Sequence, residues 1–446
     1  MDIEELIIKD VRCFAGEQRL RIRPLTFLVG ENSTGKTTAF GCFQVLQNFL
    51  RSFGPFGDLN FNTAPYQMGT FLDISRKIDS ENKKSFALGF KLKTRGERGK
   101  LEYLAEFVEG ERGAEPALRR QRIITDKGEI ILDRNKNLAR TQRGVFEPKY
   151  DDVKTRREKR IFRIKHHFPY EANAWNLLGD FYHYFSEKKK DPVAQEYAKF
   201  IESVLDLSCG DREGLSDIGS DRHYSFGPIR SQPQRTYDSL KEAMTPDCDD
   251  IPMALRRIYR NKKAWKSLEK KLVQFGENSG LFSAISVKEP LGHSMADPFQ
   301  LLVTVRGVTV NLMDAGYGVS QILPILVRLF VAEQPATFLI QQSETHLYPR
   351  VQAELTSLLV ELIKDSHHQF FIETHSDFMI DRVRIEIKEG NISPDDVSLI
   401  YLEPLPSKYA VKGHNIEFDE QANLENVPDG YRDFFSKETN RLLGWD

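Results

Sequence analysis

The sequence of 446 residues has few cysteines, no long apolar run and no excess of charge of one sign. Its four cysteines, Cys13, Cys42, Cys209 and Cys248, lie far apart and form no C-x-x-C pair, which argues against a disulfide framework and against a cysteine metal cluster. No window approaches the roughly 18 apolar residues of a membrane span, and the N-terminus lacks a basic-then-apolar signal sequence. We therefore expect a cytoplasmic protein with reduced thiols and no membrane partner.

The charges nearly balance, with 63 basic and 65 acidic residues and a formal net charge of -2. Overall charge therefore favours neither nucleic acid nor a membrane surface as a partner. Residues 149–167 form the only dense basic stretch. Most such runs are solvated helix faces or loops, and we favour that interpretation; the alternative is a contact for a nucleic-acid backbone or an acidic partner.

Residues 30–37, GENSTGKT, match the phosphate-loop pattern G-x-x-x-x-G-K-[ST] at every fixed position. An apolar stretch precedes them and a helical pattern follows, so backbone N–H groups and a helix N-terminus can face an anion. In such a loop Gly35 permits close approach, Lys36 spans the outer phosphates and Thr37 offers a hydroxyl to Mg²⁺. The pattern predicts a nucleoside triphosphate site. The residues that we expect to contact the nucleotide are Asn32, Ser33, Thr34, Gly35, Lys36, Thr37 and Thr38.

Periodicity places this loop between a strand at 19–29 and an amphipathic helix at 37–53, with another strand at 3–9. Short alternating runs between 86 and 132, with a hairpin-like turn at 126–128, predict an antiparallel β-subdomain beside the nucleotide. Helical patterns at 175–205 and 236–275 then indicate a mainly α insertion.

From residue 300 onward strands and helices alternate, which is typical of a parallel sheet covered by helices. The predicted strands are 299–305, 337–340, 369–374 and 398–402, and the predicted helices are 319–331 and 351–363. We therefore predict an α/β fold whose nucleotide core is split. Its parts are 1–110 with the phosphate loop and β-subdomain, 111–298 as the insertion, and 299–446 as the rest of the core.

Three further motifs follow in order. Residues 314–321, DAGYGVSQ, bring two glycines and a serine to a helix N-terminus, which suits the γ-phosphate of a nucleotide held by another subunit. Residues 338–349 end an apolar strand in polar residues, where a phosphate-loop ATPase places its Mg²⁺-holding acid and the carboxylate that orients water. Residues 372–377 end another strand, and His375 is placed to hydrogen-bond the γ-phosphate or the attacking water.

Together these motifs resemble the ATP-binding-cassette (ABC) class of ATPases, the group with structural-maintenance-of-chromosomes heads and overcoming-lysogenization-defect nucleases. They resemble most the bacterial AAA-type proteins found in phage-defence operons. Residues 11–14 look like the short F-x-x-F-like turn of these relatives, and 316–324 like their signature. Residues 341–349 look like their E-x-P-E-x-H-L-x-P segment, and 374–376 like T-H-S.

The resemblance runs from residue 3 to about 435 and is weakest at 110–220. It also includes residues 66–71, which resemble the segment with the glutamine loop, and 227–230 and 233–237, which resemble a recurring insertion element.

The resemblance implies an ABC-type phosphate-loop ATPase with ATP and Mg²⁺ as cofactors, an antiparallel β-subdomain and a large, mainly helical insertion. Two subunits would sandwich two ATP molecules. Gln67 would contact metal or water. The residues that would bind the nucleotide of the other subunit are Gly316, Gly318, Ser320 and Gln321.

The chain departs from these relatives where they carry acids, because Gln341 and Gln342 occupy those positions and Glu344 is the only carboxylate left in that segment. An amide supplies no charge to Mg²⁺ and is no base at neutral pH. Either a trapping substitution was introduced to hold ATP, or the protein is a naturally slow ATPase. Both predict strong ATP binding with slow or disabled hydrolysis. The predicted catalytic residues are Glu344, His375 and Gln342, and the predicted metal contacts are Thr37, Gln67 and Gln341.

The leading hypothesis for function is a sensor and scaffold subunit of a bacterial anti-phage system. It would form a homodimer or higher homo-oligomer around ATP and control a separate effector protein such as a nuclease, since no nuclease domain is expected before the chain ends near Trp445. One alternative is a DNA-engaging repair or clamp ATPase that grips phosphates with residues 149–167. Another is the energising subunit of a transporter, which the long insertion between phosphate loop and signature argues against.

Overall fold

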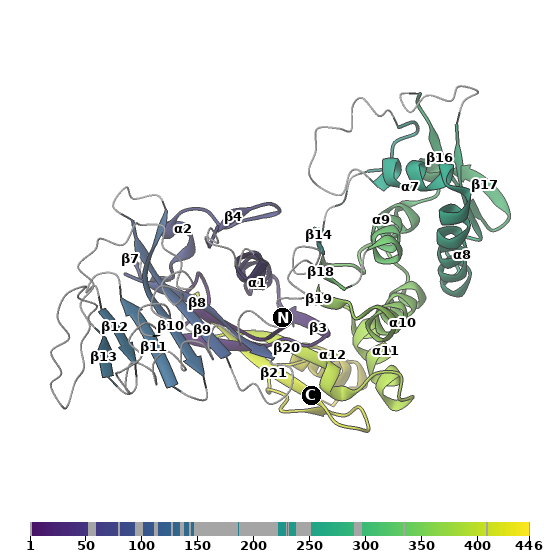
Figure 1. The fold of residues 1–446 in the computed structure, drawn as a ribbon. Coiled ribbons are helices and arrows are strands. Elements are labelled where there is room, and N and C mark those ends of the chain that lie inside the picture. Colours follow the sequence, from purple (N-terminus) through teal and green to yellow (C-terminus); the bar gives the residue numbers. More distant parts are fainter. Residues whose placement is uncertain are drawn as a thin grey trace.

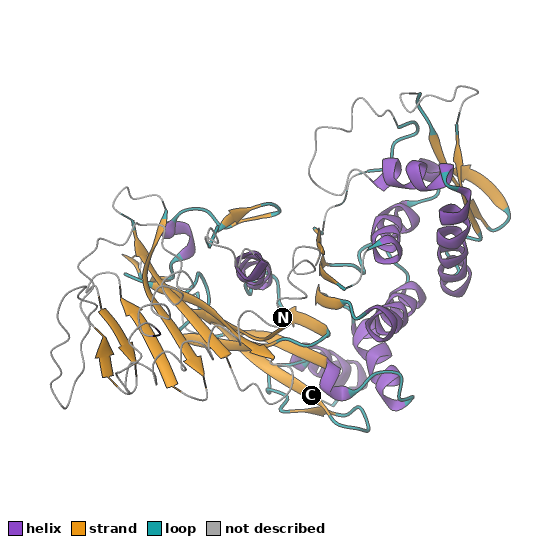
Figure 2. Cartoon of the chain, in the orientation of Figure 1, coloured by secondary structure: helices purple, strands orange, loops and turns teal. Residues whose placement is uncertain are grey.

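In the computed structural model, one large β-sheet lies at the centre of the protein and a second lies on one side of it (Figures 1 and 2). Most helices lie on the other side of the central sheet. The residues that the structure describes are 2–51, 59–78, 81–93, 101–110, 115–125, 128–133, 138–141, 144–146, 186, 222–228, 230, 232–237, 251–289, 297–332, 335–406 and 409–445.

An eight-stranded antiparallel sheet forms the β-subdomain, in the order β13-β12-β11-β10-β9-β8-β1-β2. Hairpin pairing such as Thr125 with Gly128 sets its register and confirms the predicted turn. Strand β9 alternates buried and partly buried residues, as expected for a sheet with one covered face. The strands are β1 (Asp2–Lys9), β2 (Glu17–Arg21), β8 (Phe86–Lys93), β9 (Leu101–Glu109), β10 (Pro116–Thr125), β11 (Gly128–Asp133), β12 (Leu138–Thr141) and β13 (Gly144–Phe146).

A seven-stranded sheet, in the order β14-β18-β19-β3-β20-β21-β22, carries the phosphate loop on its central strand. The first five of these strands run parallel. Strand β21 pairs antiparallel with β20, and β22 pairs antiparallel with β21. Strands far apart in the sequence therefore end at one edge of the sheet, which is the usual ligand edge of such folds. The strands are β14 (Arg222–Phe226), β18 (Ala336–Gln341), β19 (Gln369–Glu373), β3 (Leu25–Gly30), β20 (Val397–Pro404), β21 (Val411–Phe418) and β22 (Leu424–Glu425).

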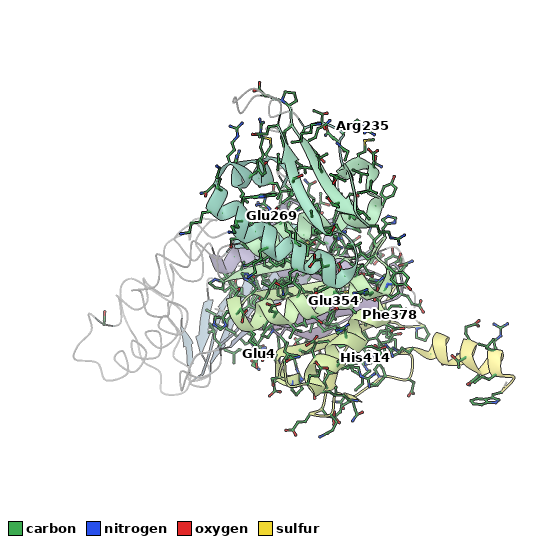
Figure 3. All side chains as sticks on the ribbon, turned by 90° about the vertical axis from the view of Figure 1, so that its right-hand side faces the viewer. Glu4, Arg235, Glu269, Glu354, Phe378 and His414 are labelled. Carbon is green, nitrogen blue, oxygen red and sulfur yellow. The ribbon has the colours of Figure 1, made fainter. Side chains whose placement is uncertain are left out.

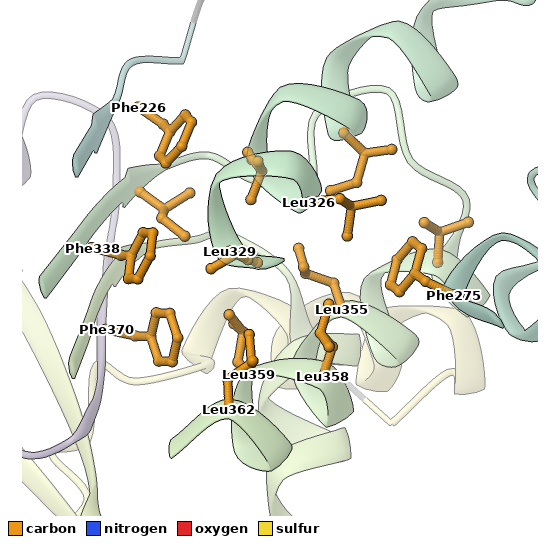
Figure 4. Packing of buried hydrophobic residues seen from close by; sticks show 14 of the residues in the cluster. Phe226, Phe275, Leu326, Leu329, Phe338, Leu355, Leu358, Leu359, Leu362 and Phe370 are labelled. Atoms are coloured by element: carbon orange, nitrogen blue, oxygen red, sulfur yellow. The ribbon is translucent and has the colours of Figure 1, made fainter. Parts of the chain in front are cut away.

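Alternate residues of the parallel strands belong to two separate hydrophobic clusters. Leu339 and Phe371 pack with α1 (Lys36–Arg51) and the antiparallel sheet, and the ring of Phe371 stacks on Phe40 with centroids 4.6 Å apart. Phe338 and Phe370 face the other way, toward α9 (Tyr317–Val331) and α10 (Pro349–Ser366), as Figure 4 shows. Because side chains alternate along a strand, the sheet separates α1 from α9 and α10.

The remaining elements flank these layers. A three-stranded antiparallel sheet, in the order β15-β16-β17, packs beside α7 and α8. The elements are α2 (Phe71–Ile74), α7 (Ile251–Arg260), α8 (Lys262–Ser279), α11 (Asp377–Lys388), α12 (Asp433–Leu443), β4 (Asn62–Thr63), β5 (Tyr66–Gln67), β6 (Lys77–Ile78), β7 (Glu81–Asn82), β15 (Ala284–Lys288), β16 (Gln300–Val305), β17 (Val308–Asn311) and the 3₁₀ turns Leu312–Asp314 and Pro394–Asp396.

The C-terminal helix α12 stands away from the body of the protein (Figure 3, yellow). No helix among the described ranges is long and apolar enough to cross a membrane.

The sequence prediction is confirmed for the α/β class and for most core elements, but two strands differ. The strand predicted at 19–29 is two strands, β2 and β3, which belong to different sheets. Pro24 lies between them, and proline lacks the N–H that a continuous ladder needs. The strand predicted at 299–305 exists as β16, yet it pairs antiparallel with β15 and β17 rather than joining the parallel sheet.

The antiparallel sheet also continues past residue 110, the predicted end of the first part, because β10 pairs with β9 and is followed by β11 to β13. In the insertion, α7 and α8 are helical as expected. The basic stretch 149–167 and almost all of the helix predicted at 175–205 lie outside the described residues.

We predict that His368 makes the fold acid-sensitive. It is 2% exposed, its Nδ1 accepts the Ala336 N–H at 3.0 Å, and burial lowers its pKa from 6.5 to about 4. Above pH 6.5 the His368 side chain is neutral in both the folded and the unfolded state. As the pH falls, His368 takes up a proton in the unfolded state first. Stability should therefore fall between pH 6.5 and about 4, by roughly 2 kcal/mol at about pH 5.

The measurement is urea unfolding at neutral pH and at about pH 5 for the protein and for His368→Asn, which keeps an acceptor near the Nδ1 position but does not titrate. The variant should lose less stability on acidification. An equal loss in both proteins would contradict the assignment.

Candidate functional site

The phosphate loop curls around the ammonium group of Lys36. Strand β3 ends at Gly30 and α1 begins at Lys36, so the lysine lies at the helix N-terminus. Its Nζ donates to the carbonyl oxygens of Gly30 at 3.0 Å and Glu31 at 2.6 Å. The Thr34 hydroxyl also donates to Glu31 O, at 2.8 Å. These contacts hold the lysine at the centre of the loop, where a phosphate-binding lysine belongs.

The loop depends on glycine at position 35. Its φ of +87° lies in the left-handed region, and a Cβ there would come within 2.4 Å of Cys13 Sγ and 3.2 Å of the Phe14 ring. The turn at residues 11–14, which resembles the F-x-x-F-like turn of related ATPases, therefore packs directly against the phosphate loop.

Strands β18 and β19 bring Gln341 and Glu373 side by side. The two residues pair in register at the ends of their strands, on the face that packs against α1. The Gln341 amide donates to Glu373 Oε2 at 2.7 Å and to the Thr37 hydroxyl at 3.3 Å. Both side chains are only 5% exposed. The buried Glu373 carboxylate is therefore linked to the Thr37 hydroxyl through the Gln341 amide.

The charges of the site converge on Lys36. Burial lowers the pKa of Lys36, and the carboxylates of Glu373, Glu31 and Glu344, in that order, act in the opposite direction. Burial and then Lys36 lower the pKa of His375, against an opposing effect of Glu373. A depressed pKa favours neutral imidazole at neutral pH, which can donate or accept a hydrogen bond.

The loops after β18 and β19 are tied together. The His375 N–H donates to Glu344 Oε1 at 2.7 Å, and the Gln342 N–H donates to Glu373 O at 2.9 Å. Gln342 has a φ of +46°, so the chain turns sharply after the strand. Glu344 Oε2 is buried and has no hydrogen-bond partner within the described ranges, so this oxygen could accept from a ligand or water.

These residues fit a nucleotide with Mg²⁺. Lys36 supplies a buried charge, Thr37 leaves its hydroxyl at an exposed helix start, and Glu344 offers an unpartnered oxygen. In the described part of the chain, no three or more His, Cys, Asp or Glu side chains are arranged so that they could hold a metal ion by themselves. Mg²⁺ needs no such cluster, because it commonly takes one or two protein ligands beside phosphate and water oxygens.

A family model described as AAA ATPase domain matches residues 1–380. The chain belongs to this family. The resemblance to phosphate-loop ATPases is thereby confirmed at family level.

Among solved structures, this ATPase domain is similar to three heads of Smc proteins. They are the SmcHead bound to the C-winged helix domain of ScpA (TM-score 0.43, 11% identity, 94% of this chain and 99% of that chain), the Smc head domain with an extended coiled coil bound to the C-terminal domain of ScpA derived from Pyrococcus furiosus (0.40, 10%, 98% and 99%) and the SMC head domain from Thermotoga maritima (0.40, 11%, 94% and 100%). No curated protein matches the chain.

Residues 66–71, which resemble a glutamine-loop segment, lie beside α1. Arg12 donates to Met68 O at 2.9 Å and to the Thr38 hydroxyl at 3.3 Å, which fastens the segment to the helix. Gln67 is on β5 with an exposed side chain, and Thr38 is buried and held by Arg12. Asn32 and Ser33 are exposed at the loop surface.

The signature segment, residues 316–324, lies apart from this site. It forms the start of α9, on the opposite face of the sheet from α1. Gly316 precedes α9 with a φ of +86° and is exposed. Gly318 lies so close to the loop after β18 that a Cβ would come 3.0 Å from His346 O. Ser320 and Gln321 are buried, and the Ser320 hydroxyl donates to Tyr317 O at 3.0 Å. The exposed part of the segment is therefore Gly316 and Tyr317 rather than Ser320 and Gln321.

Sequence reasoning gave no role to Glu373 or Arg12, although both stood inside quoted motifs. Another contact without a predicted role is the bidentate ion pair of Arg235 with Asp314, at 2.7 and 2.9 Å. It links residues 233–237 to the turn just before the signature segment. Arg230 donates to Gln341 O at 3.1 Å. The alternation of strand residues could have pointed to Glu373, because it lies two residues after the apolar Phe371.

We predict that Gly35→Ala disrupts the loop more than Gly16→Ala. Both glycines have positive φ, but a Cβ at position 16 meets nothing within 4 Å, so only position 35 adds a clash, which typically costs about 1–3 kcal/mol. Thermal unfolding and ATP affinity measure the difference. Equal effects of the two substitutions would contradict it.

Proposed function

We propose that this protein is an ATP-operated switch that binds Mg²⁺-ATP in one subunit and closes on the signature segment of a second. In this proposal ATP binding joins the subunits and slow hydrolysis releases them. The joined form is the sensor and scaffold subunit of a bacterial anti-phage system and controls a separate effector. A γ-phosphate biasing two states is a common basis of nucleotide switches.

The observation that carries the proposal is the separation of the two nucleotide motifs by the sheet. The phosphate loop begins α1 on one face, and the signature begins α9 on the other (Figure 1). Gly316 is exposed at the start of a 15-residue helix, so its N-terminal N–H groups and dipole are available to an anion from outside the chain. A nucleotide in the phosphate loop of another subunit is the anion that we assign to it.

Within one subunit the chain's own residues have separate roles. Lys36 and the loop N–H groups bind the phosphates, and Thr37 with its neighbours holds Mg²⁺, which neutralises charge on the phosphates when bound. His375 and Glu344 lie at the strand ends beside them, where His375 can donate a hydrogen bond to a phosphate oxygen. Gln342 replaces the residue that would accept a proton from water, so we expect slow turnover.

The defence role rests on the resemblance of residues 341–349 and 374–376 to proteins of phage-defence operons. A repair or clamp ATPase is the second candidate, favoured by the basic stretch 149–167. DNA binding that weakens steeply with salt would support that candidate, since phosphate contacts release counterions.

We predict that Lys36→Ala abolishes both ATP binding and ATP-dependent assembly, because it removes the buried positive charge at the centre of the phosphate loop. The measurement is ATP affinity together with oligomer mass, with and without ATP. Lys266→Ala, at an exposed position of α8, is the matched control and should behave like the unsubstituted protein. ATP-dependent assembly of the Lys36→Ala protein would sink the model in which ATP joins the subunits.

We predict that Gln342→Glu raises the rate of ATP hydrolysis by at least roughly tenfold, because a carboxylate can serve as the base that an amide cannot. The rate is measured at saturating ATP and Mg²⁺. Gln421→Glu, on the exposed loop between β21 and β22, controls for added charge. An unchanged rate would mean that position 342 does not limit turnover.

A further inference from the structure

The buried carboxylate of this site lies on a different strand from the one the resemblance indicates. Gln341 occupies the position of the first acid after the strand, yet its lateral neighbour on β19 is Glu373. The two side chains share one face, are equally buried at 5% exposed and are joined by a 2.7 Å hydrogen bond. The acid and the amide therefore occupy adjacent places on neighbouring strands, and the negative charge is on β19.

Glu373 is also oriented toward the working parts of the site. Its partner Gln341 donates in addition to the Thr37 hydroxyl at 3.3 Å, so carboxylate, amide and hydroxyl form one connected group at the start of α1. Glu373 has the largest effect of any acid on Lys36. Its charge thus acts on the phosphate-binding lysine more than that of Glu344 does.

A purely structural role would explain these contacts poorly. Burying a carboxylate is unfavourable unless it is paired and fully hydrogen-bonded. Within the described ranges one amide donates to the Glu373 side chain, and a second amide in place of Glu373 would satisfy Gln341 as well. The buried ammonium of Lys36 compensates part of this charge, and a bound cation next to Thr37 would complete the compensation.

We propose that Glu373 is the carboxylate that holds Mg²⁺ beside Thr37, in place of an acid at position 341. Gln341 then positions Glu373 and Thr37 relative to each other. The inference rests on the proposed nucleotide site. It places the carboxylate that binds the metal at the end of β19 instead of the end of β18.

The test compares the unsubstituted protein, Glu373→Gln and the exchange variant Gln341→Glu/Glu373→Gln. Each is titrated with the non-hydrolysable analogue adenylyl imidodiphosphate, once in excess Mg²⁺ and once in EDTA. The ratio of the two affinities reports the metal contribution without any turnover. Mn²⁺ binding followed by electron paramagnetic resonance in the presence of the analogue provides a direct second readout.

We expect Glu373→Gln to reduce the tightening by Mg²⁺ roughly tenfold or more. Its affinity in EDTA should stay the same or increase, because a negative charge near the phosphates has been removed. The exchange variant should regain the Mg²⁺ effect, since it restores one carboxylate to the same pair. Glu361→Gln, which removes an exposed acid on α10 outside the nucleotide site, should keep the Mg²⁺ effect.

An unchanged Mg²⁺ effect in Glu373→Gln would overturn the inference while leaving the nucleotide site intact. Equal losses in Mg²⁺ and in EDTA would also overturn it, because they would indicate a structural role. If Glu373→Gln does not fold, the exchange variant is the deciding measurement. If Mg²⁺ does not tighten binding of the analogue to the exchange variant, the inference is overturned. Failure of the unsubstituted protein to bind the analogue in either condition would overturn the proposed function as well.

Discussion

Parallel pairing of β3 with β19, and of β19 with β18, is the constraint on which the rest of the structure depends. It brings three strand ends to one edge, although β3 is more than 300 positions away from β18 and β19 in the chain. Because the strands are buried on both faces, alternate side chains must satisfy two different clusters. At the ends of the strands the same alternation directs Gln341 and Glu373 toward α1, so packing of the core and assembly of the site have one cause.

The same sheet also separates the two motifs to which we assign nucleotide contacts. α1 covers one face and presents the phosphate loop, whereas α9 and α10 cover the other and present the signature segment. Buried side chains pack on both faces of the sheet, and small movements of such a packed layer do not bring both segments to one phosphate. The proposed completion of the site by a second subunit requires no rearrangement within one subunit.

The sequence predicted the elements that have strong local signals. Residues 30–37 carry a motif whose glycine and lysine have geometric roles in the structure, and the apolar runs ending at Gln341 and Glu373 were recognised as strands. It did not predict which sheet a strand joins, because pairing is non-local. β16 therefore appeared to belong to the parallel sheet, and the break at Pro24 between β2 and β3 was missed. The burial of Ser320 and Gln321 was hidden for the same reason, since it depends on what packs against α9.

Glu373 does not stand out in the sequence, because the resemblance places the acid at the end of β18, whereas Glu373 is the last residue of β19. In a parallel sheet, however, paired residues at the ends of neighbouring strands point to the same face, whereas successive residues of one strand point to opposite faces. An acid can therefore stand on either of two neighbouring strands and still belong to the same site. Two carboxylates at 341 and 373 would repel each other and raise the pKa of one. An amide at one place and an acid at the other avoids that repulsion and supplies a donor to hold the acid. The amide at position 341 and the acid at position 373 are thus best understood as one unit rather than as a loss on one strand and an unrelated charge on the next.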